Sequence, residues 1–500
     1  MPDFHTCNAV IMDVPKLPVI MDVPKLPKLP LGPAAAMQST TSVLATLVVY
    51  NAILIGVGLW AKGRNRDVED FFLASRGLGA WVGAISASAS SSSAWTLLGV
   101  SGAAYAWGLP ALWIFPSTVG GFLLNWAWVA PRLQKLAAAE QAVTLSAVIA
   151  PQTIGGKRRI ILRTAALIIV FCFTFYIASQ FEAAGKAFES VFELSKQNSI
   201  LIGAAIVLVY TLLGGFWAVS VTDMVQGLLM AVAALVLPIA ALAAVGGFGR
   251  LADGLRDIGS AGSPMAGSAA VGIFFVLGLM GIGINYPGQP HVVNRFMALK
   301  DDAALRQGRI IAMAWAVIVY AGMLLLGLCS RVLFADLGDA EQVLFKAATD
   351  LLPAIVAGIM LAAVLSAIMS TADSQLLVAS SAISYDWNLA ERQEQAGLSG
   401  TRRTVVIVLI MATILSLVWR ADIFSRVLFA WSAAGSAFGP ILILRLAGRF
   451  VSPNATLAAM LAGFGLTVII SLFPNAPGDA AERLVPFFAA LAIAVAGSRK

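Results

Sequence analysis

Residues 86–99 read SASASSSSAWTLLG, and this stretch decides how the chain is interpreted. It places six serines in the eight positions 86–93, inside a segment that is otherwise apolar enough to cross a bilayer. Hydroxyl groups and non-helical backbone persist at membrane depth only where they face protein or a polar cavity. The stretch is therefore predicted to form part of a binding site inside a membrane-spanning bundle.

The composition of the whole chain is that of an integral membrane protein. Of its 500 residues, 59% are hydrophobic and 12% are charged, whereas a soluble domain carries about 25% charged residues. Apolar runs of about 20 residues, long enough to cross a bilayer as helices, recur from residue 41 onward. We predict an all-α polytopic membrane protein with about 13 transmembrane helices. The predicted spans are 41–61, 78–106, 111–131, 162–186, 199–217, 221–245, 269–292, 310–330, 351–384, 403–420, 424–447, 454–473 and 483–498.

The placement of lysine and arginine predicts the orientation of these spans. Of the 33 basic residues, 21 lie in or beside the odd-numbered connections and the C-terminus, and cytoplasmic loops are the ones that collect basic residues. The net charge of +7 is therefore assigned to membrane topology, and no nucleic-acid partner is expected. The N-terminus is predicted outside and the C-terminus in the cytoplasm, which requires an odd number of spans.

The first residues do not share this pattern. VIMDVPKLP occurs at 10–18 and again at 19–27, and proline at this density prevents both helix and interior strand. We predict a disordered tail there. A misassigned start, with translation beginning at Met37, accounts for the tail as well as a binding role does. The chain is accordingly divided into four parts: 1–36, the tail; 37–77, the first span with its cytoplasmic loop; 78–450, the transport core; and 451–500, additional C-terminal spans.

Two of the spans are predicted to be discontinuous helices. In 78–106 the serines divert helical hydrogen bonds onto their own side chains, so the helix is expected to unwind near Ala89 to Ser92. In 269–292 several glycines precede Pro290, which has no amide hydrogen for the helix. Interrupted helices in spans two and seven are typical of an inverted five-plus-five repeat that holds its substrate near the midplane. The alternative is that glycine and serine only permit close helix packing.

A third set of polar residues lies in the ninth span, LSAIMSTADSQLLVASSAISYD at 365–386. A carboxylate at bilayer depth costs about 2.5 to 3.5 kcal/mol, so Asp373 is expected to be protonated, paired or facing a cation. Four nearby residues share one face of a helix, at i, i+3, i+4 and i+7: Ala367, Ser370, Thr371 and Ser374. Oxygen ligands without a histidine or cysteine cluster suit a hard cation, and sodium is the cation we predict.

Six segments, in their order and spacing, carry a resemblance to a known family. They are DFFLASRGLG at 70–79, SASASSSSAW at 86–95, WIFPSTVGGFLLNW at 113–126, GGFWAVSVTDMVQ at 214–226, GQPHVVNRFMA at 288–298 and MSTADSQLLVASSAI at 369–383. From about residue 45 to 450 the chain resembles the sodium/solute symporters, and most closely the bacterial sodium/proline symporters. The resemblance implies Na+ as the coupling ion, a thirteen-span layout and a place in the bacterial inner membrane.

The resemblance also implies roles for individual residues. The principal sodium site would be formed by the carbonyls of Ala89, Ser92 and Ala367 with the hydroxyls of Ser370 and Thr371. Some relatives, including sialic-acid transporters, place a second ion nearby, so Asp223, Ser370, Asp373 and Ser374 are candidates for a second ion or for coupling. Whether one or two ions move is left open. The solute would be lined by Tyr176, Tyr286 and Pro290.

Two positions on the solute face depart from the sodium/proline symporters. Ser91 stands where those proteins carry an aspartate, in the pattern SDMSGW, and Ile282 stands where they carry a tryptophan. We hypothesise that Asp373 supplies the missing negative charge from the facing helix. The lost tryptophan leaves the identity of the solute open.

The function predicted from these observations is sodium-coupled symport of a small organic solute into the cell, most consistent with an amino acid such as proline. Two alternatives stay open: a solute sensor built on a transporter fold, and a proton-coupled carrier of an amino acid or small carboxylate that uses Asp373. No enzyme is predicted, because the chain has two histidines and no HExxH, GxSxG or Cys–His set. Arg295 and Lys300 are expected to snorkel at the cytoplasmic face. The partners expected are the solute and the lipid bilayer, and the oligomeric state is left open.

Overall fold

The structure is a computed structural model that describes residues 45–46, 48–54, 56–57, 60, 73–150, 156–192, 194–213, 216–258, 269–387, 398–418, 422–473 and 477–499. The predicted tail 1–36 and most of 37–77 lie outside the described residues.

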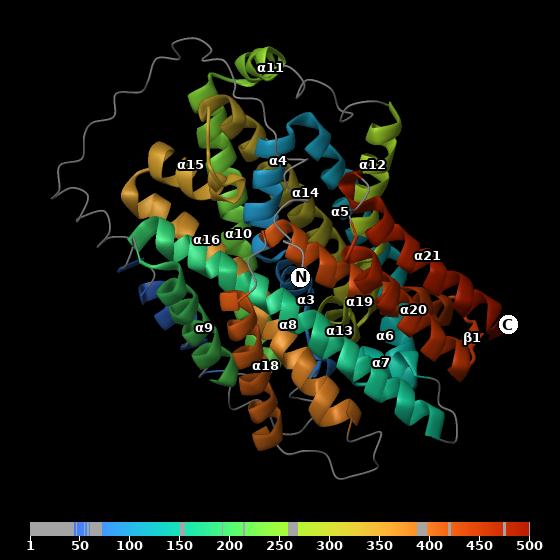
Figure 1. Cartoon of the computed structure of the whole chain (residues 1–500). Helices are drawn as coiled ribbons and strands as arrows, with labels where there is room; N and C mark the ends of the chain where they lie inside the picture. Colours follow the sequence, from blue (N-terminus) through green and yellow to red (C-terminus); the bar gives the residue numbers. More distant parts are fainter. Residues whose placement is uncertain are drawn as a thin grey trace.

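The described chain is a bundle of helices (Figure 1). Its α-helices are α3 Ala80–Ser91, α4 Val100–Trp107, α5 Ile114–Leu124, α6 Ala130–Ala139, α7 Leu145–Ile149, α8 Gly156–Phe192, α9 Lys196–Leu213, α10 Phe216–Val245, α11 Phe248–Asp257, α12 Ala269–Ile284, α13 Pro290–Ala298, α14 Asp302–Leu333, α15 Val343–Leu351, α16 Ala354–Ser381, α18 Leu398–Val418, α19 Ile423–Leu446, α20 Pro453–Ser471 and α21 Ala480–Ala496. Two short strands, β1 Phe450–Val451 and β2 Ser498–Arg499, pair antiparallel beside the C-terminus.

Eight helical segments of the described residues are long and apolar enough to cross a membrane. They are Leu109–Ala139, Gly156–Glu189, Phe216–Val245, Val271–Gly288, Asp302–Leu333, Ala354–Trp387, Ile423–Leu446 and Pro453–Ser471. Arg403–Val418 is apolar but shorter, α21 has 17 residues, and the predicted span 78–106 is divided between α3 and α4. The prediction of an all-α polytopic membrane protein is confirmed, whereas the count of thirteen stays a prediction.

Local sequence signals set the ends of several helices. The Asp301 side chain accepts a hydrogen bond from the amide of Ala304 and caps α14, and Asp422 caps α19 in the same way through Ser425. Ser452 caps α20, which begins with proline. Such side chains satisfy amides that the first turn of a helix leaves without a partner.

Burial separates the central helices from the outer ones. Helix α16 is buried along nearly its whole length, and 89% of the most apolar window of α19 is buried, against 28% for α20. Large apolar side chains such as Leu167, Ile239 and Ile310 are exposed on the outside, as expected for surfaces that face lipid. Helices α3 and α10 pack against each other, and each of them packs against both α14 and α16, which places the serine stretch at the centre of the bundle.

Candidate functional site

The first break in a helix follows the serine stretch. Helix α3 ends at Ser91, and Ser92 leaves the helical conformation with φ −118° and ψ 18°. The Ser91 hydroxyl donates to the carbonyl of Ser88 at 2.9 Å, as expected for serines that compete with the helix ladder. Beyond the break, the amide of Ala94 donates to Gln180 Oε1 of α8 at 3.1 Å. A π-helical turn, Trp95–Gly99, then leads into α4.

Hydroxyl groups of α16 meet carbonyl groups at the end of α3. Thr371 Oγ1 lies 3.2 Å from the carbonyl oxygen of Ser90. Ser370 Oγ lies 3.5 Å from that of Ala89 and 3.3 Å from that of Ala367 in its own helix. Both hydroxyl-bearing side chains are fully buried. The contact therefore gathers oxygen atoms from two helices in a water-poor interior, which is the donor set that a hard cation prefers.

These contacts relate directly to the predicted sodium ligands. The structure brings four of them together, namely Ala89, Ala367, Ser370 and Thr371. The fifth, Ser92, lies at the break itself, and its hydroxyl is 3.4 Å from Tyr320 Oη of α14.

A buried ion pair lies beside this contact. Arg295 Nη2 in α13 is 2.9 Å from Asp223 Oδ2 in α10, and the two side chains are 1% and 0% exposed. The Ser86 hydroxyl donates to Asp223 at 2.8 Å. The expectation that Arg295 snorkels at the membrane surface is wrong. Because α12 stops at Ile284 and the chain turns before α13 begins at Pro290, Arg295 lies inside the bundle.

Ser90 connects the ion pair with α16. Its hydroxyl donates to Asp223 at 3.2 Å and lies 2.9 Å from the hydroxyl of Ser374. The Ser374 hydroxyl also lies 3.2 Å from Asp373 Oδ1. The four residues predicted for a second ion or for coupling, Asp223, Ser370, Asp373 and Ser374, are thus linked through Ser90 and neighbouring hydroxyls.

The second break separates α12 from α13. After Ile284 the chain passes through Asn285 and a 3₁₀ turn, Tyr286–Gly288. Side-chain amides bind the carbonyls that this break leaves free: Asn125 donates to Tyr286 at 3.2 Å, and Gln289 donates to Asn285 at 3.2 Å. Gln289 also donates to the carbonyl of Trp431 in α19 at 2.8 Å. Amide side chains therefore bind the free carbonyls of the second break, and the Ser117 hydroxyl binds the backbone of the last turns of α12 before it.

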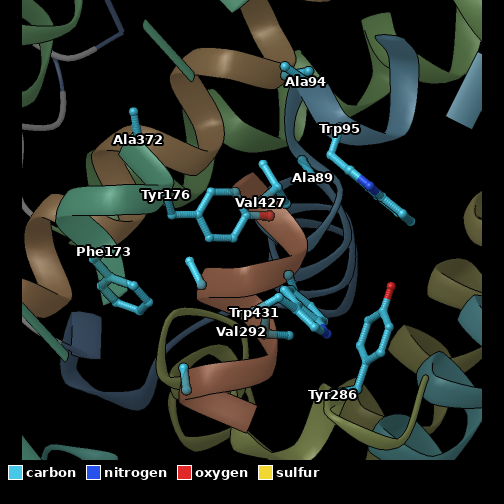
Figure 2. Close-up of a cluster of buried hydrophobic side chains, with 14 of the residues drawn as sticks. Ala89, Ala94, Trp95, Phe173, Tyr176, Tyr286, Val292, Ala372, Val427 and Trp431 are labelled. Carbon is cyan, nitrogen blue, oxygen red and sulfur yellow. The ribbon is translucent and has the colours of Figure 1, made fainter. Parts of the chain in front are cut away.

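Aromatic rings surround the second break (Figure 2). The rings of Tyr286 and Trp431 meet edge to face with centroids 4.7 Å apart, and the indole N–H of Trp431 donates to the carbonyl of Ile282 at 3.1 Å. The hydroxyls of Tyr286 and Tyr320 are 3.2 Å apart. In the view of Figure 2, Trp431 lies between Tyr176 and Tyr286.

The residues predicted to line the solute are buried but differ in their surroundings. The Tyr176 hydroxyl donates to Ser93 Oγ at 3.2 Å, so it reaches the first break from α8. Ser91 bonds within its own helix, Ile282 is buried at the end of α12, and Pro290 begins α13.

Sequence reasoning missed Tyr320 and Trp431. A signal for Tyr320 was present, because its hydroxyl lies at bilayer depth in the predicted span 310–330 just as the serines do in theirs.

Comparison with known proteins identifies the family of this fold and site. The sequence profile of the Sodium:solute symporter family matches residues 71–463. The chain belongs to the sodium:solute symporter family. This symporter is 34% identical over 452 residues to the sodium/proline symporter of Escherichia coli, covering 87% of this chain and 88% of that one. It is 32% identical over 456 residues to the osmoregulated proline transporter of Bacillus subtilis, covering 89% and 92%.

Solved structures share the fold of this symporter. A Na+-coupled sialic acid symporter, in a substrate-bound outward-open state, superposes with a TM-score of 0.73 at 15% identity, covering 92% of this chain and 98% of that one. A transporter of the nucleobase-cation-symport-1 family gives 0.56 at 12% identity, covering 86% and 95%. The predictions of family, sodium-coupled symport of a small organic solute and sodium as the coupling ion are confirmed. The relatives are transporters of bacterial membranes, and the chain is a multi-pass inner-membrane protein.

Proposed function

We propose that this symporter imports proline or a closely similar amino acid together with sodium. The single observation that carries the proposal is the contact of α16 with α3, where Ser370 and Thr371 direct hydroxyls at the carbonyls of Ala89 and Ser90. The names of the bacterial relatives, which are proline transporters and sodium/proline symporters, supply the solute class.

The sodium site consists in this proposal of the carbonyls of Ala89, Ser92 and Ala367 and the hydroxyls of Ser370 and Thr371. α3 with α4 forms one discontinuous membrane span, and α12 with α13 forms another, as spans two and seven of an inverted five-plus-five repeat within 78–450. The fold of the solved symporters supports this organisation. The N-terminus lies outside and the C-terminus in the cytoplasm, in agreement with the basic residues of the odd-numbered connections.

The solute lies in this proposal between the two breaks, against Tyr176, Tyr286 and Pro290, with Ser91 on the side of α3. Ile282 offers no aromatic surface. Trp431 supplies one instead, because its ring packs on Tyr286 and its N–H binds the carbonyl of Ile282. A flat apolar wall beside hydroxyl groups suits a small zwitterion with an aliphatic ring.

Transport then depends on sodium stabilising the outward-open state of the bundle more than the state that is open to the cytoplasm. Sodium bridges α3 and α16, which favours the outward-open state that binds solute, and rocking of the bundle exposes both ligands to the cytoplasm. Each sodium ion contributes about 2.3 kcal/mol per 100 mV of membrane potential, whereas tenfold accumulation of solute costs about 1.4 kcal/mol. One ion therefore suffices to drive strong uptake, and no catalytic chemistry is assigned to the chain.

Asp373 provides in this proposal the charge that Ser91 lacks. It is fully buried in α16 one residue before Ser374, whose hydroxyl contacts it. Asp373→Asn is expected to abolish or sharply weaken stimulation of uptake by sodium, because the cation loses a nearby negative charge. Unchanged sodium dependence of the variant would contradict this role.

Uptake by purified protein in proteoliposomes tests the function. Labelled proline, other amino acids and small carboxylates are offered under an imposed sodium gradient, an imposed proton gradient or neither. Sodium-driven accumulation of proline is expected, and competition by the panel ranks the solutes. Accumulation driven only by protons would favour the proton-coupled carrier, and binding of solute without accumulation would favour the sensor.

A further inference from the structure

The guanidinium of Arg295 is held by four separate elements. Its Nε donates to Ser86 Oγ of α3 at 3.0 Å, and Nη1 donates to the carbonyl of His291 in its own helix, α13. Its Nη2 donates to Asp223 Oδ2 of α10 at 2.9 Å and to Ser374 Oγ of α16 at 2.5 Å. The planar fork of arginine suits such a set of fixed acceptors. The cation is therefore positioned by the packing of the bundle and not by solvent.

Two of these acceptors are candidates for a second sodium ion. Asp223 and Ser374 direct oxygen atoms at Arg295 Nη2. A sodium ion bound to the same oxygens would lie next to a buried positive charge. Like charges in a low-dielectric interior disfavour each other strongly, so the guanidinium and a second sodium ion exclude one another at this position.

The charges around the α3–α16 contact lead to the same conclusion. Arg295 and Asp223 form an ion pair in which both side chains are buried. Because this pair is already neutral, a second sodium ion bound to the same oxygens would add a positive charge without a partner. Unpaired charge in a buried site is costly.

We propose that Arg295 is a built-in cation that takes the place of a second sodium ion, so that this symporter couples one sodium ion to each solute. The inference rests on the proposed function and deepens it by assigning the ion count and the residue that determines it. Ser90 couples the Arg295–Asp223 pair to the proposed sodium site at the α3–α16 contact. Its hydroxyl contacts Asp223, and its carbonyl accepts a hydrogen bond from Thr371.

The test measures both coupling and binding. Radioactive sodium and labelled proline fluxes in proteoliposomes give the coupling ratio, and the midpoint of thermal unfolding against sodium concentration reports binding without transport. For the native chain we expect about one sodium ion to be transported with each proline. We also expect a Hill coefficient for sodium of about 1, because the coefficient cannot exceed the number of sites. In Arg295→Gln the oxygens of Asp223 and Ser374 become available, and the Hill coefficient for sodium-dependent stabilisation is expected to rise toward about 2.

Two variants serve as controls. Arg295→Lys keeps a cation at the position and is expected to retain a coefficient of about 1. Arg483→Gln removes another buried arginine, which lies in α21, pairs with Asp479 just before that helix at 2.5 Å and donates to the carbonyl of Gly278 in α12. This variant is expected to leave the sodium coefficient unchanged. If Arg295→Gln does not fold, the double variant Asp223→Asn with Arg295→Gln removes both charges of the pair, and the coupling ratio of the native chain remains decisive.

The outcomes separate the inference from the function on which it rests. Sodium-driven uptake with about two sodium ions per solute in the native chain would overturn the inference and leave the proposed function intact. A folded Arg295→Gln protein with unchanged sodium binding would overturn it as well. Absence of any sodium-driven uptake would instead reject the proposed function.

Discussion

Both breaks leave backbone groups without a hydrogen-bond partner in the helix, and different side chains bind these groups at each break. At the first, after α3, the free backbone groups face serine and threonine hydroxyls from α16, and a buried ion pair lies next to them. At the second, between α12 and α13, the free carbonyls bind the amide side chains of Asn125 and Gln289. The rings of Tyr286 and Trp431 pack at the second break, whereas the hydroxyls of Tyr176 and Tyr320 reach the serines of the first.

In the proposed function, this difference accounts for how one bundle binds two ligands. Hydroxyls and carbonyls at the first break are all oxygen atoms and can turn toward a cation, since a hydroxyl hydrogen rotates at little cost. Amide side chains that already bind two carbonyls hold the second break rigid, and rings packed on it offer a fixed apolar surface. In the proposed function, the first break therefore binds sodium and the second contacts the body of the solute.

The largest effect is expected from a substitution that adds a side-chain atom where Gly288, at the second break, lies close to Gly435. In Gly288→Ala the new Cβ would lie 2.4 Å from the carbonyl oxygen of Gly435, a backbone atom that cannot easily move. Overpacking of this kind costs about 1 to 3 kcal/mol or more. We expect loss of folded protein in size-exclusion chromatography. Gly120→Ala, whose Cβ meets nothing within 4 Å, is the matched control, and equal yields of the two variants would contradict the close contact.

Removing one hydroxyl from the first break is expected to affect sodium alone. Thr371→Ala deletes the oxygen that lies 3.2 Å from the carbonyl of Ser90. Polar contacts to a charged group contribute about 1.5 to 3 kcal/mol, so the sodium concentration for half-maximal uptake should rise about 10- to 100-fold. Ser380→Ala, whose hydroxyl donates within α16 to Leu376, is the control. A change in solute affinity without a change in sodium affinity would argue against the separation of the two breaks.

The converse variant removes a polar contact at the second break. Trp431→Phe keeps a ring beside Tyr286 but loses the N–H that donates to the carbonyl of Ile282 at 3.1 Å. A buried acceptor without its partner costs about 1 kcal/mol or somewhat more, so KM for solute should rise about five- to tenfold. Sodium affinity at saturating solute should not move. Trp81→Phe, an exposed tryptophan on α3, provides the comparison.

The smallest expected effect concerns Glu341, which lies in a short 3₁₀ helix outside the membrane spans. Burial raises the pKa of Glu341, whose carboxylate binds Lys186 at 2.6 Å and accepts the amides of Ile423 and Phe424 at the start of α19. Because the folded-state pKa lies above the unfolded value, this group's contribution to stability is fully present below the unfolded pKa and is lost as pH rises through the raised pKa.

The measurement for Glu341 is the Tm of native protein minus that of Glu341→Gln across this pH range. The difference should fall as pH rises, by about 1 to 2 °C, because a given free energy moves Tm little in a large chain. A difference that grows with pH would show that ion pairing with Lys186 outweighs burial.

Part of this site could be predicted from the residues themselves. The spacing of Ser370 and Thr371 on a helix placed both hydroxyls on one face, and this face does contact α3. Arg295 was misjudged, because it follows the predicted span 269–292 and the sequence does not show that the helix beyond the break, α13, lies inside the bundle. Trp431 was missed because nothing in the sequence of α19 indicates which helix its ring will meet.

Composition and periodicity were enough to predict the class of the protein, the approximate spans and the polar residues that do not suit lipid, since hydrophobicity and helical periodicity are properties of neighbouring residues. Which of those polar groups meet depends on the tertiary structure. The pairing of Asp223 with Arg295 and the approach of α16 to α3 join residues 72 to 281 positions apart. Such contacts depend on how whole helices pack, and no local pattern encodes them.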